Sequence, residues 1–294
     1  SFKLFIQKFY QMIEIGIGFI AAIFWGIHDF LVRFIVKKVN IITALVCTNV
    51  FGALFLLAFF FFSRQGISFD KKIIVFSIIY GLLFLSATYC LYNAFDLGPV
   101  FVAAPIISSY PILSLFYASI LSNPPEIYQW ILSIFVIFGI FLTIYSKSEN
   151  TKSSKLKISS TIFWSIAASI LFSLSFQLGQ HEIINSFEVL SNLFARISAV
   201  VVLGTLLFNK INFKLLKLNH ILILILMGIL DTLALLIMVY SGNFDEPEFS
   251  SVSASTFGLI TILLVCFFYQ EKLNRIQICG IFLVFSSIAI LSMG

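Results

Sequence analysis

Long apolar segments, each about the length that a helix needs to cross the hydrocarbon core of a bilayer, follow one another along the whole chain. Short polar stretches separate them, and none of these is large enough to form a soluble domain. Ten apolar segments can be counted, at residues 13–36, 41–62, 73–95, 100–121, 127–145, 161–180, 189–208, 221–241, 251–270 and 276–293. We therefore expect an all-α integral membrane protein with ten transmembrane helices.

Composition supports a membrane location. Hydrophobic residues make up 60% of the chain, charged residues only 11%, and the mean hydropathy is +1.08. Soluble domains have about 25% charged residues, so this much apolar surface needs lipid as a second solvent. The net charge of +5 is spread over the polar stretches, which indicates contact with lipid head groups and no nucleic-acid partner.

A hydrophilic stretch rich in Lys and Ser divides the apolar segments into two sets of five. We expect a first five-helix repeat at residues 1–146, a linker at 147–160 and a second repeat at 161–294, all forming one structural unit. The last helices of the two sets correspond, since in each a polar residue is followed, after five residues, by the Gln that opens the helix: Asn123 and Gln129 in the first set, Glu271 and Gln277 in the second. Five is odd, so the second repeat enters the membrane with opposite polarity, which is the inverted-repeat arrangement of many secondary transporters.

Four short motifs are typical of one transporter family. They are the Ala-rich Trp-Gly segment at residues 21–26, Tyr110-Pro111, Arg196 early in a span, and Glu271-Lys-Leu followed by Gln277 and Gly280. On these motifs the sequence resembles the EamA family of the drug/metabolite transporter superfamily. The resemblance implies a basket of ten helices around a central cavity. It also implies transport of small metabolites, with amino acids as frequent substrates.

Ionisable residues within the apolar segments are the first candidates for a functional site, because a charge in hydrocarbon is costly and usually faces a cavity. Asp231 lies near the middle of its span, so it either pairs with a cation such as Arg196 or lines the pathway, where it can carry a proton. Arg196 can bind a substrate carboxylate or serve as the partner of a buried acid. Asp29 shares a helix face with Arg33 and can pair with it, and His28 is adjacent.

Polar and aromatic side chains in the spans are further candidates for lining the cavity. Prolines free backbone carbonyls in the fourth span, beside Ser109 and Tyr110, and the matching part of the ninth span contains Ser255. Small residues there also suit close helix packing, so both interpretations are open. The remaining candidates are Trp25, which can clamp an apolar group, and Gln177 near the end of the sixth span.

Sequence motifs for catalysis are absent. His181-Glu182 does not continue into HExxH, and the chain has neither a GxSxG nor a P-loop sequence. The four cysteines lie in apolar runs without metal-ligand spacing, so we expect no disulfide, metal site or cofactor. We expect no enzyme and no catalytic residue.

The expected function is secondary transport of small metabolites, most plausibly export of amino acids or related compounds, by alternating access. An uncoupled channel-like facilitator and a non-transporting membrane scaffold are the alternatives. Protons are the candidate coupling ion, the protein is a monomer or homodimer, and its location is the cell membrane, as a multi-pass protein of the bacterial inner membrane. Orientation stays open, because the distribution of Lys and Arg favours termini outside, whereas the resemblance favours termini inside.

Overall fold

The computed structural model is all-helical across the parts of the chain that it describes, which are residues 2–63, 70–113, 127–145, 152–183, 187–244, 247–270 and 273–291. The helices are α1 (Phe2–Ile35), α2 (Ile41–Ser63), α3 (Lys71–Leu97), α4 (Val100–Ser108), α6 (Ile127–Tyr145), α7 (Lys152–Glu182), α8 (Glu188–Leu206), α9 (Leu218–Tyr240), α10 (Pro247–Ala254), α11 (Phe257–Tyr269) and α12 (Arg275–Leu291), with short 3₁₀ turns η1 (Phe208–Lys210), η2 (Phe213–Leu215) and η3 (Ser241–Asn243).

Within the described residues, seven helical segments are long and apolar enough to cross a membrane. Three shorter apolar helices, Val100–Leu113, Ile127–Thr143 and Arg275–Ile290, accompany them. The prediction of an all-helical, multi-pass membrane protein is therefore confirmed. The number of ten transmembrane helices stays a prediction, because the three shorter helices lie below the usual spanning length.

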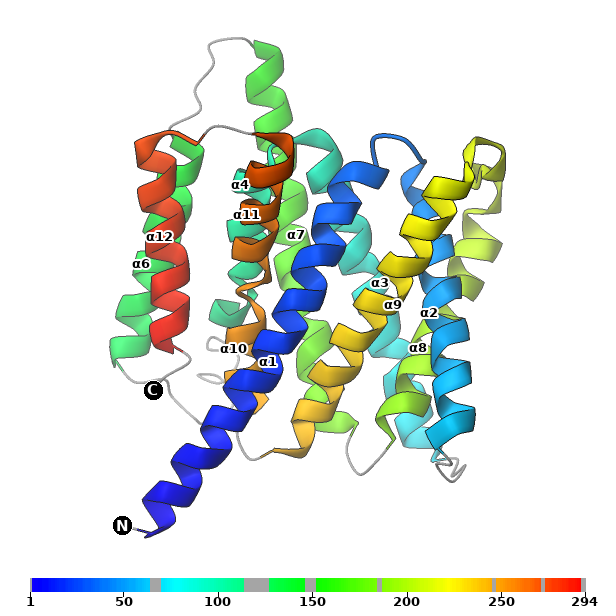
Figure 1. The fold of residues 1–294 in the computed structure, drawn as a ribbon, viewed down its shortest axis with the longest axis horizontal. Helices are drawn as coiled ribbons and strands as arrows, with labels where there is room; N and C mark the ends of the chain where they lie inside the picture. Colours follow the sequence, from blue (N-terminus) through cyan, green and yellow to red (C-terminus); the bar gives the residue numbers. More distant parts are fainter. Residues whose placement is uncertain are drawn as a thin grey trace.

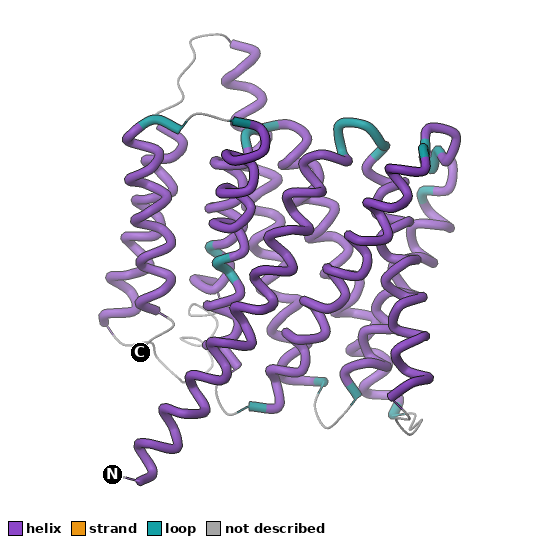
Figure 2. The backbone as a smooth tube through the Cα atoms, viewed as in Figure 1, coloured by secondary structure: helices purple, strands orange, loops and turns teal. Residues whose placement is uncertain are grey.

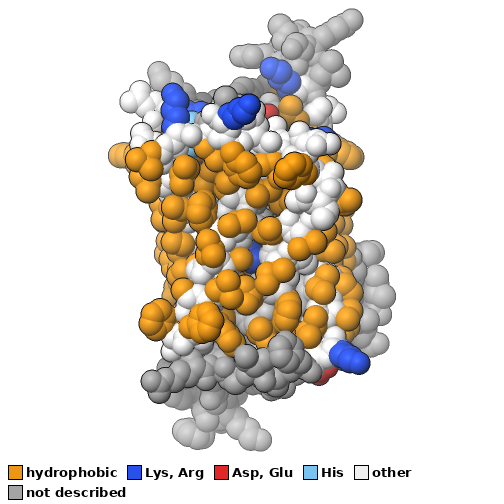
Figure 3. Space-filling model, turned by 90° about the vertical axis from the view of Figure 1, so that its right-hand side faces the viewer, with side chains coloured by type: hydrophobic (Ala, Val, Ile, Leu, Met, Phe, Trp, Pro, Cys, Tyr) orange, Lys and Arg blue, Asp and Glu red, His pale blue; other side chains and the backbone are white. Residues whose placement is uncertain are grey.

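The outer surface of the bundle is apolar at mid-height. Phe138 of α6 and Phe282 of α12, each near the middle of its helix, are 52% and 74% exposed, as expected for side chains that face lipid tails and not water. Figure 3 shows the same pattern on one side of the molecule, where hydrophobic side chains cover the middle and most of the visible Lys and Arg side chains lie toward the two ends, with one small blue patch near the centre.

The two halves of the chain exchange partners in a reciprocal way. Helix α1 packs against α9 while α7 packs against α3, and α2 contacts α9 as α8 contacts α3. Two further pairs join corresponding helices. Helix α2 packs against α8 on the right-hand side of the bundle in Figure 1, and α6 packs against α12 on the left-hand side. Helix α7 begins on the side opposite to the start of α1, so the halves run in opposite directions across the bundle.

Both segments for which irregular backbone is expected are interrupted helices. Helix α4 ends at Ser108, and Ser109 forms a turn before helical residues resume at Tyr110. In the second half, Ser255 and Thr256 separate α10 from α11, and Figure 2 shows this break halfway along the bundle. The interrupted helices cross closely, because a Cβ on Gly258 would lie 3.0 Å from the carbonyl oxygen of Ala104.

Two predicted boundaries differ from the observed ones. Helix α7 begins at Lys152, inside the predicted linker 147–160, because the Lys and Ser residues there continue the helix beyond its apolar part. The predicted ninth span, 251–270, begins four residues late, since α10 starts at Pro247, a residue that favours the first turn of a helix. Residues 114–121 of the fourth span, 147–151 of the linker and the motif residue Glu271 lie outside the described residues.

Candidate functional site

A cavity lies at the centre of the bundle, among α1, α3, α7, α9 and α11. The cavity is narrow, and the centre of a water molecule can occupy about 10 Å³ of it. That is roughly the room that one water molecule requires. The residues that line it are Trp25, His28, Asp29, Phe84, Thr88, Leu91, Phe172, Phe176, Asp231 and Phe257.

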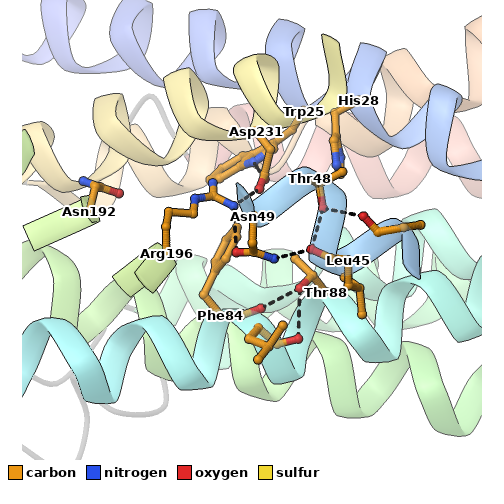
Figure 4. A network of polar contacts seen from close by, with 12 residues as sticks. Trp25, His28, Leu45, Thr48, Asn49, Phe84, Thr88, Asn192, Arg196 and Asp231 are labelled. Carbon is orange, nitrogen blue, oxygen red and sulfur yellow. Dashed lines mark hydrogen bonds and ion pairs between the residues drawn. The ribbon is translucent and has the colours of Figure 1, made fainter. Parts of the chain in front are cut away.

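Asp231 and Arg196 form a buried ion pair beside this cavity. The distance from Arg196 Nη1 to Asp231 Oδ2 is 2.7 Å, and both side chains are almost fully buried. The other oxygen, Asp231 Oδ1, accepts a 3.0 Å hydrogen bond from Trp25 Nε1, so both oxygens have a donor. Asp231 therefore pairs with Arg196 (Figure 4) and is also among the residues that line the cavity.

Arg196 reaches Asp231 from α8 through a space left by a small residue on α2. A Cβ on Gly52 would lie 3.4 Å from Arg196 Nε, and the guanidinium carbon sits 5.7 Å from the centre of the Phe84 ring. Arg196 Nη1 also lies 3.3 Å from Asn49 Oδ1, to which it donates. Arg196 is not among the residues that line the cavity, so Asp231 and Phe84 present the surface of this pair to a ligand.

His28 and Asp29 form a second polar group on α1. His28 Nδ1 lies 2.9 Å from Asp29 Oδ1, and His28 Nε2 lies 3.3 Å from the hydroxyl of Tyr92 on α3. Asp29 Oδ2 is buried and has no hydrogen-bond partner within the described chain. Arg33, the partner considered from helix spacing, directs Nη1 to the carbonyl oxygens of Phe95 and Gly98, at 2.6 and 3.3 Å.

Aromatic rings form most of the cavity wall. The Trp25 ring centre lies 5.2 Å from that of Phe176 and 6.2 Å from that of Phe257, and Phe172 stacks on Phe176 at 5.6 Å. The sequence analysis did not select any of the phenylalanines. A Phe in a transmembrane helix can face either lipid or an apolar cavity, so no pattern in this single sequence distinguishes the two locations.

The remaining candidates from the sequence lie around the cavity but do not line it. Tyr110 is fully buried behind the wall, where its ring meets Phe176 at 5.0 Å and its hydroxyl donates to the carbonyl oxygen of Ser251 at 2.6 Å. Ser109 Oγ and Ser255 Oγ donate to carbonyl oxygens of their own helices, which stabilises the two breaks. Gln177 is half-buried on α7 outside the lining.

A network centred on Gln180 closes the end of the bundle at which α7 ends and α10 begins. Gln180 Nε2 donates to Ser241 Oγ at 2.8 Å and to the carbonyl oxygen of Pro247 at 3.2 Å, while Ser251 Oγ donates to Gln180 Oε1 at 2.9 Å. Nearer the rim, Lys72 pairs with Glu182 at 3.1 Å. These contacts join α7 to η3, α10 and α3 at that face of the protein.

Metal binding has no support in the described segments, where no three His, Cys, Asp or Glu side chains gather closely enough to hold an ion. The arrangement instead offers two carboxylates, one imidazole and several aromatic faces to an organic ligand or a proton.

Comparison with known proteins places the whole arrangement in context. The model of the EamA-like transporter family matches residues 12–145 and again residues 159–293, which confirms the resemblance drawn from the motifs. A solved structure titled "Crystal structure of protein" aligns with a TM-score of 0.72 over 94% of this chain and 97% of that chain, at 14% identity. At that identity the likeness shows a shared fold alone. No curated protein gives a match.

Proposed function

Because this chain belongs to the EamA-like transporter family, which contains membrane transporters of the drug/metabolite kind, we propose that it is a secondary carrier for small metabolites, most plausibly an exporter of amino acids or related compounds. The observation that carries this proposal is the central cavity, where Asp29 and Asp231 from different helices meet aromatic rings at mid-bundle. Ionisable groups at that depth mark substrate or ion pathways in membrane proteins.

Carrier behaviour fits the cavity better than a channel-like facilitator does. Room for about one water at the centre does not allow a metabolite to diffuse through, so passage requires a conformational change. The reciprocal packing of the two halves supports ten helices arranged as inverted five-helix repeats. In such transporters one repeat rocks against the other around a fixed midplane site, which is the alternating-access mechanism.

Asp231 and Arg196 have defined roles in this proposal. Their ion pair joins α8 to α9 beside the cavity and presents Asp231 to the substrate, while Asp231 or Asp29 carries the coupling proton. The interrupted α4 and α10–α11 segments supply the irregular backbone that carriers of this type place around their sites. We place the protein in the bacterial inner membrane as a monomer or homodimer.

Counterflow in proteoliposomes tests this function. Vesicles are loaded with one member of a panel of amino acids, amines, nucleosides and sugars, and uptake of its radiolabelled form is followed. Saturable uptake that is stimulated by the internal substrate, and strongly reduced in Asp231→Asn, supports a carrier with Asp231 in its pathway. Asp96→Asn is the matched control, since this carboxylate pairs with Lys37 at the partly exposed rim.

Other outcomes identify the alternatives. Flux that lacks saturation and stimulation by internal substrate indicates a channel-like facilitator. A folded protein that moves nothing across the panel contradicts transport and favours a scaffold.

A further inference from the structure

We propose that the central cavity selects ligands by a protonated amine, which the carboxylate of Asp29 holds against the aromatic wall. This inference rests on the proposed transport function and narrows its substrate class to organic amines, with or without a second polar group. In this proposal no residue of the cavity binds an anion. It therefore differs from the other possibility that the sequence offers, in which Arg196 binds a substrate carboxylate.

The two carboxylates of the cavity differ in how they are compensated. Asp231 has Arg196 at 2.7 Å and the indole N–H of Trp25 at 3.0 Å, one on each oxygen. Asp29 has only the ring of its neighbour His28, on Oδ1, and its Oδ2 has no hydrogen-bond partner in the described part of the chain. Asp29 is only 2% exposed, so Oδ2 is a buried hydrogen-bond acceptor that a donor group of a ligand can satisfy.

The charges around the cavity also favour a cationic ligand. The charges of Arg196 and Asp231 offset each other, whereas His28 offsets Asp29 only if it is protonated. With a neutral His28 and an ionised Asp29, the polar centre carries one net negative charge in a region of low dielectric constant. A ligand ammonium group would neutralise that charge and donate to Asp29 Oδ2.

The wall of the cavity suits a cation and offers nothing to an anion. Among its ten lining residues are five aromatic side chains and two carboxylates, but no Lys or Arg. Faces of Trp and Phe rings attract ammonium groups through their quadrupoles, most strongly when water is excluded. A ligand carboxylate placed here would meet Asp29 and Asp231 at close range. Arg196, whose Nε and Nη2 are buried without a hydrogen-bond partner in the described chain, does not line the cavity.

The size of the space is consistent with an ammonium head group. The water-sized volume at the centre admits a primary ammonium, which is similar in size to a water molecule. The rest of the ligand needs the aromatic rings to move apart, as the alternating-access proposal requires.

Three ligands that share one carbon frame test the inference. Norleucine carries both an amine and a carboxylate, pentylamine lacks the carboxylate, and hexanoate lacks the amine. Binding to the purified full chain in detergent is followed by the fluorescence of Trp25, in a background with Trp130→Phe and Trp164→Phe. We expect pentylamine to bind at least as tightly as norleucine, and hexanoate to bind at least about tenfold more weakly, as expected for the loss of a charge-assisted hydrogen bond.

Variants at Asp29 complete the test. Asp29→Asn should weaken pentylamine binding by at least about tenfold, while Asp29→Glu, which keeps the charge, should retain most of it. Asp96→Asn serves as the control at the rim. The ligand comparison on the unmodified chain stands by itself if Asp29→Asn does not fold.

The outcomes separate this inference from the function on which it rests. Hexanoate binding as tightly as pentylamine, or pentylamine binding that Asp29→Asn leaves unchanged, overturns the inference. Saturable counterflow of neutral or anionic substrates only would leave the carrier in place and also overturn amine selection. Amine binding without any counterflow would support the site and contradict transport.

Discussion

Gly139 of α6 and Gly280 of α12 face each other so closely that neither position has room for a side chain. A Cβ on Gly139 would lie 2.8 Å from the carbonyl oxygen of Gly280, and a Cβ on Gly280 would lie 2.7 Å from that of Gly139. In the alignment that places Gln129 opposite Gln277, Gly139 falls opposite Ser287 and Gly280 opposite Leu132, so the contact joins corresponding helices at non-equivalent positions. A contact between the corresponding last helices of the two halves is what a two-fold axis within a single chain produces.

Alanine at Gly139 should destabilise the protein. The added methyl group would press on the backbone of α12, and overpacking of this kind costs about 1–3 kcal/mol. Gly204→Ala is the matched control, because its Cβ would meet open space and the substitution favours the helix by about 1 kcal/mol. Thermal unfolding in detergent should show a lower Tm for Gly139→Ala only. An equal Tm for both variants would contradict close packing at the crossing.

Separating Arg196 from Asp231 should cost more than removing both. Arg196→Gln or Asp231→Asn alone leaves one buried charge without its partner, which costs about 3–5 kcal/mol. The double variant removes both charges and should be more stable than the less stable single variant. Unfolding of all four proteins in detergent gives the coupling energy. Additive losses would mean that the pair at 2.7 Å contributes no mutual stabilisation.

Loosening the Gln180 network should open the cavity toward the side where α1 begins. Gln180→Leu removes three hydrogen bonds to Ser241, Pro247 and Ser251. At about 1 kcal/mol each, their loss raises the open population by on the order of a hundredfold. Labelling of Thr88→Cys, introduced into a cysteine-free background, by an impermeant maleimide in oriented vesicles measures this opening.

Two comparisons calibrate that experiment. Tyr110→Phe removes one hydrogen bond, to the carbonyl oxygen of Ser251, and should give a smaller increase in labelling. Thr205→Val removes a hydrogen bond of an exposed side chain within α8 and should give no increase. Equal labelling in all variants would show that the network does not close this end.

The face at which α1 ends should be cytoplasmic. Basic side chains gather there on the α8–α9 connection and beside it, whereas Lys72 on the opposite face is paired with Glu182. Exposed Phe208 and Phe213 alternate with Lys210 and Lys214 in this connection, a composition suited to an anionic membrane surface. The basic residues are Lys37, Lys38, Lys157, Lys210, Lys214, Lys217 and Arg275.

Cysteine accessibility decides the orientation. In a cysteine-free background, Lys214→Cys should react with an impermeant maleimide only after the cells are permeabilised, and Lys72→Cys should react in intact cells. The reverse pattern would place the basic face outside.

The helices themselves were predictable because lipid imposes a minimum apolar length on each span. Irregular backbone was predictable in the fourth span from its prolines, whereas Ser255 in the ninth span suited a break and close packing equally. The position of Asp231, Asp29, His28 and Trp25 beside the cavity could also be predicted, since an ionisable residue within a span usually faces a cavity and not lipid.

The aromatic wall could not be predicted. In a soluble protein the hydrophobic face of a helix points to the core, but here both sides are apolar, so sequence periodicity does not orient Phe84, Phe172 or Phe257. Which oxygen of Asp29 has no partner depends on the rotamers of Asp29 and of the side chains around it, and sequence spacing does not determine these rotamers.

The reciprocal packing of the two halves has an evolutionary and a stereochemical consequence. A symmetric pair of identical chains would place every charged residue twice around its axis, and a bound molecule would have two equivalent poses. Fusion into one chain lets the copies diverge, and here Asp29 and His28 belong to the first copy while Arg196 and Asp231 belong to the second. The helix packing is reciprocal but the ionisable groups at its centre are not, so a polar molecule bound there has one preferred orientation and not two.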